Sequence, residues 1–155
     1  MKIIIDTNLW VSFLIGKKTS VLESLLSNAN LTIYVCDNLL DEFKRVVEKP
    51  KIQKYIPEED IVATLELIVM FCTHATLNKT AVSPVRDVND LYLLSLAETV
   101  SADFILTGDK DLLTLESHHQ TKIVTYSTFV SWYIPNREVK TDCANGTAPK
   151  EWKSR

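Results

Sequence analysis

The sequence predicts an α/β fold, a three-layer sandwich around a central, mainly parallel sheet. Short runs of strand-forming residues alternate with helix-periodic segments along most of the chain. The first run, Ile3 to Ile5, is apolar at every position, as expected of a strand covered on both faces. With 155 residues and 46% hydrophobic content, the chain is long enough to enclose one core.

The N-terminal part of the chain predicts one strand followed by two helices. The β-branched residues Ile3 to Ile5 favour extended backbone and form the first strand. Residues 8–15 are largely apolar and predict a short buried helix that ends at Gly16. A second helix is expected over residues 20–27, because Ser20 can cap its N-terminus.

The next segment repeats the pattern of strand and helix. Residues 31–36 alternate β-forming side chains and predict the second strand. A helix that begins at Asp37 or Asn38 is expected to run through Val47 and to stop before Pro50. Residues 57–71 predict a longer amphipathic helix, with a proline and three acids in its first turn.

The remaining segments continue the alternation as far as residue 133. Strands are expected at 75–77, 103–106 and 122–125, and helices at 88–100, 111–115 and 128–133. From Pro135 onward the chain is polar and loses its periodicity. We therefore expect one domain over residues 1–134 and a mobile tail over residues 135–155.

Composition narrows the class of protein. The net charge of −3 argues against a protein that coats nucleic acid by charge alone. The cysteines Cys36, Cys72 and Cys143 are odd in number and form no Cys-x-x-Cys pair, so we expect reduced thiols, with the first two in the core. No apolar run is long enough for a membrane span, and no signal peptide is apparent. The expected location is the cytoplasm.

Asp6 and Glu42 are the first two candidate site residues. Asp6 follows the first strand, at the edge where open α/β sheets bind ligands, although it could equally cap the next helix. Glu42 lies roughly 100° from the centre of the apolar face of its helix, at the margin of the core. Asp41 lies roughly 160° away and should face solvent. An ordinary flanking carboxylate remains an alternative for Glu42.

Two further pairs of acids occur at element boundaries. Asp87 and Asp90 begin a nearly apolar helix, where they could also act as an acidic capping box. Asp109 and Asp111 follow a strand and Gly108, and Asp111 could cap the next short helix. Thr107, between the strand and these acids, is a candidate hydrogen-bonding neighbour.

Taken together, these acids predict a metal site. Carboxylates that gather at one edge of a sheet repel and raise each other's pKa, a penalty that a bound cation removes. An all-oxygen donor set suits Mg²⁺ or Mn²⁺ better than zinc. His118 and His119 are expected in a solvated loop, because consecutive residues of an extended chain do not both face one ion.

A cluster of positive charge lies next to Glu42 in the sequence. Such a cluster is usually a solvated helix face, but it can also follow a phosphate backbone. Its members are Lys44, Arg45, Lys49, Lys51 and Lys54.

The motifs together resemble those of the PIN domain, a family of metal-dependent nucleases, over roughly residues 1–133. The matching segments are Ile-Ile-Asp-Thr-Asn at 4–8, Leu-Leu-Asp-Glu-Phe at 39–43, Val-Val-Glu-Lys-Pro-Lys at 46–51, Asp-Val-Asn-Asp at 87–90 and the segment 102–113. The subgroup that the chain most resembles is the toxin component of bacterial toxin–antitoxin systems, typically single-domain ribonucleases inhibited by a small antitoxin.

The resemblance implies roles for individual residues. It implies Mg²⁺ or Mn²⁺, a water nucleophile that attacks an RNA phosphodiester, 5′-phosphate products and a small antitoxin as partner. Exposed apolar helix faces make a homodimer reasonable. The implied acidic quartet is Asp6, Glu42, Asp90 and Asp109, with Asp87 and Asp111 as accessory acids and Asn8 and Thr107 as neighbouring polar groups.

Two other functions remain open at this point. A strand that ends in aspartate also begins phosphatases of the haloacid-dehalogenase type, which form an aspartyl-phosphate. Those enzymes need a second aspartate two residues later, where this chain has Asn8. The other alternative is a catalytically inactive PIN-like binding module, against which the complete acid set argues.

Overall fold

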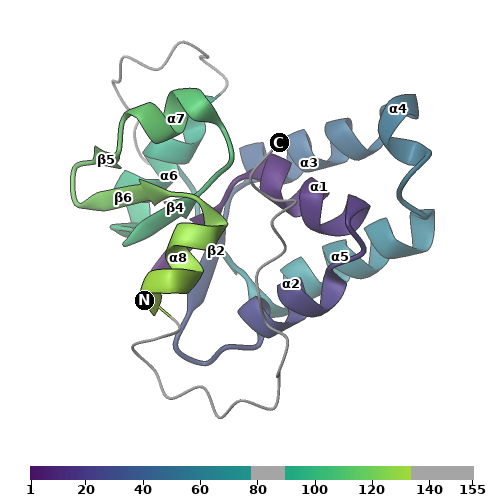
Figure 1. The fold of residues 1–155 in the computed structure, drawn as a ribbon, viewed down its shortest axis with the longest axis horizontal. Helices are drawn as coiled ribbons and strands as arrows, with labels where there is room; N and C mark the ends of the chain where they lie inside the picture. The colour runs from purple at the N-terminus through teal and green to yellow at the C-terminus, as the bar shows by residue number, and fades with distance from the viewer. Residues whose placement is uncertain (78–89, 134–155) are drawn as a thin grey trace.

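The computed structural model describes residues 1–77 and 90–133, which form a six-stranded sheet of order β3-β2-β1-β4-β6-β5 (Figure 1). All neighbouring strands are parallel except the antiparallel pair β5–β6. The strands are β1 (Lys2–Ile5), β2 (Thr32–Val35), β3 (Thr73–His74), β4 (Phe104–Leu106), β5 (Ser117–His118) and β6 (Thr121–Val124).

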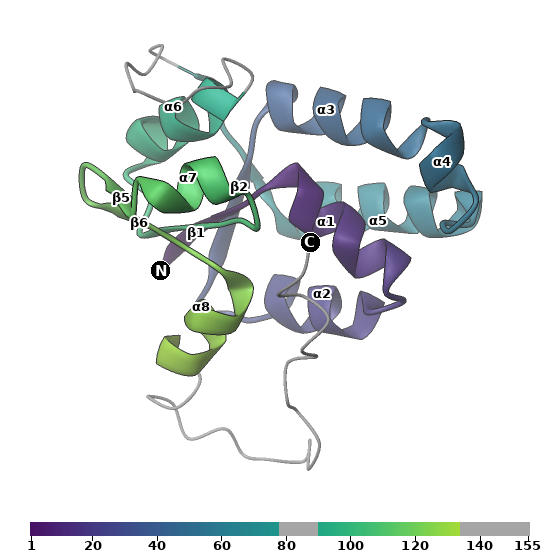
Figure 2. The ribbon, with the colours of Figure 1, turned by 45° about the horizontal axis from the view of Figure 1, so that its top comes forward.

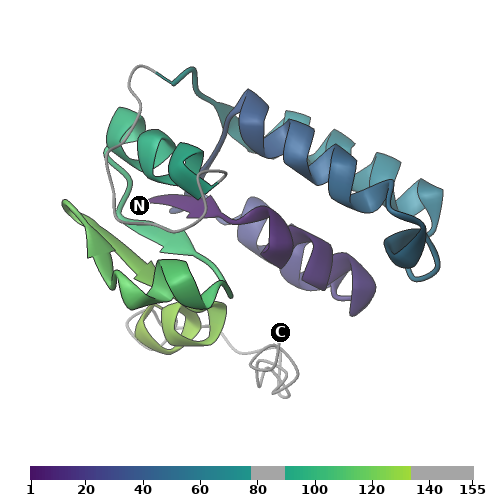
Figure 3. The same cartoon turned by 90° about the horizontal axis from the view of Figure 1, so that it is seen from above.

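The helices cover both faces of this sheet. They are α1 (Thr7–Ile15), α2 (Thr19–Leu26), α3 (Asp37–Val47), α4 (Pro50–Gln53), α5 (Glu58–Phe71), α6 (Leu91–Val100), α7 (Lys110–Thr114) and α8 (Tyr126–Tyr133). Seen from above, α6 lies on one side of the sheet and α7 and α8 lie on the other (Figure 3). Helices α1 to α5 pack together beside the sheet (Figure 1). The predicted three-layer α/β sandwich is confirmed.

Strand β1 lies between β2 and β4 and forms the centre of the core. Ile3, Ile4 and Ile5 are fully buried, as their β-branched apolar run predicts for a strand covered on both faces. Only Asp6 separates β1 from α1, and the buried Trp10 indole donates a hydrogen bond to the Ile5 carbonyl at 2.9 Å. This bond fixes the start of α1 against the strand, and with it the backbone around Asp6.

The predicted elements are found with small shifts in their ends, but two elements were not predicted. Helix α3 stops before Pro50, as expected. Pro50 also begins α4, because proline is favourable in the first turn of a helix. The short strand β5 was expected to be loop. Strand β3 lies at Thr73–His74 rather than at 75–77.

Several predictions concern residues outside the described ranges. The tail over 135–155, Cys143 and Asp87 belong to this group, so these expectations stay predictions. Cys36 is buried, Cys72 is half-buried, and both are free thiols. Within residues 1–77 and 90–133, no helix has the length and apolar character that crossing a bilayer requires.

Candidate active site

Asp6 lies at the carboxyl end of β1 and is only 3% exposed. Its backbone N–H donates to the Leu106 carbonyl at 2.9 Å, so the pairing with β4 continues up to this residue. Its carboxylate makes no capping hydrogen bond to α1. Instead, the Thr107 hydroxyl, directly after β4, donates to Asp6 Oδ2 at 2.7 Å. The capping alternative is therefore wrong, and the expected hydrogen-bonding role of Thr107 is found.

The surroundings of Asp6 favour its protonated form. Burial and the nearby carboxylates of Glu42 and Asp109 raise its pKa from 3.8 to about 6, with burial the largest cause. The Thr107 hydrogen bond acts in the opposite direction but only partly offsets these effects. A buried acid beside two other acids is the electrostatic condition that a bound cation would relieve.

Glu42 lies half-buried on α3, as the helical geometry predicts, while Asp41 is exposed. The Thr7 hydroxyl donates to Glu42 Oε2 at 3.2 Å, and the Tyr92 hydroxyl donates to the same oxygen. The Thr7 and Tyr92 hydroxyl oxygens lie 3.3 Å apart. Three helices, α1, α3 and α6, therefore meet at one carboxylate.

Sequence reasoning missed both Thr7 and Tyr92 as site residues. Thr7 is fully buried directly after Asp6, and Tyr92 carries a hydroxyl in the mostly apolar first turn of α6. A buried tyrosine hydroxyl usually needs a hydrogen-bond partner, so its position was a usable signal. Burial and the hydrogen bond to Glu42 raise the pKa of Tyr92, which keeps the hydroxyl protonated and able to donate.

Asp109 is the N-cap residue of α7. Its Oδ1 accepts hydrogen bonds from the backbone N–H groups of Asp111 at 2.7 Å and Leu112 at 3.4 Å. Its own N–H donates to the Thr107 hydroxyl at 3.0 Å, so Thr107 links Asp6 with Asp109. The alternative in which Asp111 caps this helix is wrong, because Asp109 does so and Asp111 lies exposed in the first turn.

The structure brings Asp6, Glu42 and Asp109 together, because the carboxylates of Glu42 and Asp109 lie close enough to Asp6 to raise its pKa. Asp90 is buried directly before α6, two residues ahead of Tyr92. Asn8 is exposed in the first turn of α1, next to Thr7. Asp87 lies outside the described residues.

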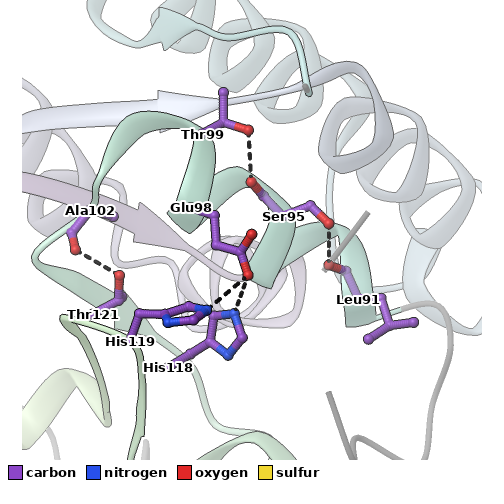
Figure 4. Close-up of polar contacts among 8 residues, drawn as sticks. All are labelled: Leu91, Ser95, Glu98, Thr99, Ala102, His118, His119 and Thr121. Atoms are coloured by element: carbon purple, nitrogen blue, oxygen red, sulfur yellow. Dashed lines mark hydrogen bonds and ion pairs between the residues drawn. The ribbon is translucent and has the colours of Figure 1, made fainter. Parts of the chain in front are cut away.

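The basic cluster is solvent-exposed at all five positions. Lys44 and Arg45 lie in the last turn of α3. The other three lysines lie in or next to α4, which follows α3 at its outer end (Figure 2). The expectation of a solvated loop holds for His119, which is exposed in a turn, but is wrong for His118, which ends β5 and is half-buried. Both imidazoles face Glu98 of α6 (Figure 4).

Comparison with protein-family models matches residues 2–111 to the PIN domain. The chain belongs to the PIN domain family. Members of this family are generally metal-dependent nucleases, so the match favours a nuclease over an aspartyl-phosphate enzyme. The PIN domain match spans Asp6, Glu42, Asp90 and Asp109. No curated protein and no solved structure matches the chain.

The residues at this edge of the PIN domain fit a divalent metal ion. PIN domains typically use Mg²⁺ or Mn²⁺, and carboxylate oxygens are the donors that these hard cations prefer. Within the described residues, no lysine or arginine forms an ion pair with Asp6, Glu42 or Asp109. The charge of the acids is thus not balanced by a described basic side chain, which is what a cation site requires.

Proposed function

We propose that this protein is a metal-dependent endoribonuclease whose acidic quartet holds Mg²⁺ or Mn²⁺. The observation that carries the proposal is the buried Asp6 carboxylate beside Glu42 and Asp109, with its pKa raised to about 6. Asp90, buried at the start of α6, completes the quartet. Asp87, Asp111 and Asn8 are proposed as accessory polar groups at the rim.

The proposed reaction is hydrolysis of an RNA phosphodiester by water, which leaves a 5′-phosphate. A bound divalent ion would lower the pKa of the attacking water and neutralise charge that develops on the phosphate. The protein's part is to hold the donor oxygens in place: Thr107 fixes Asp6 Oδ2, and the backbone of α7 fixes Asp109 Oδ1.

Glu42 is the proposed group for the attacking water or for a second ion. Its Oε2 accepts hydrogen bonds from Thr7 and Tyr92, which leaves Oε1 for the water's proton or for a metal. A carboxylate held by two hydroxyls keeps one orientation, and fixed orientation is what proton transfer in the transition state needs.

The exposed basic residues of α3 and α4 are proposed to bind the RNA backbone. Lys44 and Arg45 lie on the same helix as Glu42, so a strand that follows them would lead toward the acids. The positive charge supplies affinity without reading bases. The members beyond Arg45 are Lys49, Lys51 and Lys54.

The test of this function is Mn²⁺-dependent cleavage of RNA by wild type and Asp6→Asn. We expect the variant to remain folded and to lose at least about a hundredfold in rate, as for removal of one essential electrostatic group. Asp41→Asn is the matched control, because this acid is exposed beside Glu42 and should leave cleavage unchanged. Undiminished cleavage by folded Asp6→Asn would remove the proposed role of Asp6.

We further propose that the nuclease acts in the cytoplasm as the toxin of a toxin–antitoxin pair, which rests on the resemblance alone. Induction of wild type should arrest growth, whereas induction of Asp6→Asn should not. Exposed Val62, Val69 and Met70 of α5 support a protein partner, either the antitoxin or a second copy of the chain. Light scattering of wild type and Val69→Asp tests the homodimer.

A further inference from the structure

We propose a second metal site, suited to Zn²⁺ and similar transition metals, formed by Glu98, His118 and His119. Glu98 lies in the last turns of α6, and the histidines lie at the end of β5 and in the turn that follows (Figure 4). Nothing in this proposal depends on the nuclease activity. The residues belong to neither the acidic quartet nor its hydrogen-bonding neighbours.

The three side chains already point at one another. Glu98 Oε1 lies 2.6 Å from His118 Nε2 and 3.4 Å from His119 Nε2. One donor atom from each residue lies within 4.8 Å of the other two. Zn–N and Zn–O bonds of about 2.0–2.2 Å place two ligands of a tetrahedral ion roughly 3.3–3.5 Å apart. A zinc ion therefore requires the Glu98–His118 pair to separate by less than about 1 Å.

The turn conformation explains how two consecutive histidines face one carboxylate. Neighbouring side chains in a regular strand point to opposite faces. His118 is the last residue of β5, but His119 has a φ of 53°, in the left-handed region that residues other than glycine rarely adopt. This backbone angle brings the two rings to a centroid separation of 4.5 Å on one side of the hairpin.

The rest of the hairpin holds these ligands in place before any ion binds. His118 pairs with Thr121 in the register of β5 and β6. The buried Thr121 hydroxyl donates to the Ala102 carbonyl at 2.7 Å, which anchors the hairpin next to the end of α6 (Figure 4). The His118 side chain is 10% exposed and that of His119 is 71% exposed. One ligand is therefore fixed by packing, and the other leaves an approach from solvent.

The donor chemistry distinguishes this site from the acidic one. Imidazole nitrogens favour Zn²⁺, Cu²⁺ or Ni²⁺, whereas carboxylate oxygens alone favour Mg²⁺ or Mn²⁺. Glu98 follows Asp90 by eight residues, which corresponds to about 12 Å along a helix axis. The two sites would thus lie toward opposite ends of α6, and a bound zinc ion would cross-link this helix to the β5–β6 hairpin.

Titration of the metal-free, full-length protein with Zn²⁺ in excess Mg²⁺ tests the proposal by calorimetry. Wild type should bind one Zn²⁺ at this site, and His119→Ala should bind it at least about tenfold more weakly. Glu98→Gln should weaken binding similarly and provides a second, nearly isosteric variant. Because the His119 side chain is exposed, its truncation should leave the fold intact, and circular dichroism checks this.

Control variants distinguish this site from other Zn²⁺ ligands. His74→Ala is the matched control, because His74 is the remaining histidine and also lies 2.7 Å from a carboxylate, that of Asp37. His74→Ala, Cys143→Ser and Asp6→Asn should retain the wild-type affinity. Absence of Zn²⁺ binding, or equal affinity in wild type, His119→Ala and Glu98→Gln, would overturn the proposal. The same follows if a control variant abolishes binding.

Discussion

One hydroxyl group stabilises the charged form of the Asp6 carboxylate, whereas the rest of its surroundings, taken together, destabilise that form. Thr107 donates to it, but burial and the acids Glu42 and Asp109 raise its pKa to about 6. In an unfolded chain the ordinary value of 3.8 applies. The metal-free folded protein therefore loses stability as pH rises through about 6, because Asp6 must then carry its charge while buried.

Asp6→Asn should consequently stabilise the metal-free protein at pH 8. A pKa shift of about two units corresponds to about 3 kcal/mol, so we expect a gain of about 1–3 kcal/mol in the free energy of unfolding. The gain should disappear near pH 3, below both pKa values, where Asp6 is mostly protonated in the folded and in the unfolded protein. Urea unfolding in EDTA at the two pH values measures it, with Asp41→Asn as control. A gain that does not change with pH would contradict the assigned cause.

Tyr92 has a positioning role in this account, through its hydrogen bond to Glu42. Tyr92→Phe removes that donor and keeps the ring, so the Mn²⁺ dependence of cleavage should shift to higher concentration. We expect a loss of about 10–100-fold in activity at low Mn²⁺, partly recovered at high Mn²⁺. Tyr55→Phe removes an exposed hydroxyl and should change nothing. A merely structural role for Tyr92 would leave the Mn²⁺ dependence unchanged.

At the scale of elements, α3 combines the two functions proposed for the site. Its middle carries Glu42, and its last turn and the neighbouring α4 carry exposed basic residues. A helix that is fixed to α1 and α6 at Glu42 presents its basic end in a defined direction. Binding of RNA and positioning of the acid would then depend on the same element.

Lys51→Gln tests the basic end of this unit. We expect weaker binding of single-stranded RNA. The slope of log affinity against log salt concentration should also be smaller in magnitude by about 0.7, because one phosphate contact is lost. Lys17→Gln, which removes an exposed lysine between α1 and α2, is the matched control. Fluorescence anisotropy at several salt concentrations measures both. Identical salt dependence in wild type and Lys51→Gln would exclude Lys51 from the RNA path.

The residue that ends α6 has a strained backbone conformation. Ser101 follows the helix with a φ of 55°, in the left-handed region where glycine is the favoured residue. Ser101→Gly should therefore raise the free energy of unfolding by about 0.5–1 kcal/mol, because the relief of strain at Cβ outweighs the larger conformational entropy that glycine gives the unfolded chain. Thermal unfolding measures this change, and a lower melting temperature would contradict it.

At the scale of the whole molecule, the sequence was sufficient for the layers and for the edge that carries the acids. The apolar run before Asp6 and the strand before Thr107 determine which strands are central, and parallel strands place their carboxyl ends together. The partners of Glu42 were not predictable in this way. Thr7 and Tyr92 lie 35 and 50 residues away from it in the sequence, and helical periodicity gives a residue's face but not what meets that face.

The prediction that His118 and His119 do not face one partner failed for a different physical reason. The interpretation of His118 and His119 assumed an extended backbone, in which two consecutive side chains diverge. The positive φ at His119 reverses this expectation, and nothing in a pair of histidines indicates such an angle. Glu98 is 20 residues away from His118, so only the pairing of β5 with β6 brings it into reach.

The central claim is that acids from separate elements hold one kind of divalent ion. Crystals grown with Mn²⁺ test it most directly, through anomalous scattering at the manganese absorption edge. The account predicts a peak with oxygen ligands from Asp6 and Asp109 at about 2.1 Å, the distance for small hard divalent ions. A fully occupied Mn²⁺ elsewhere, with Asp6 and Asp109 making no contact to any ion, would contradict it.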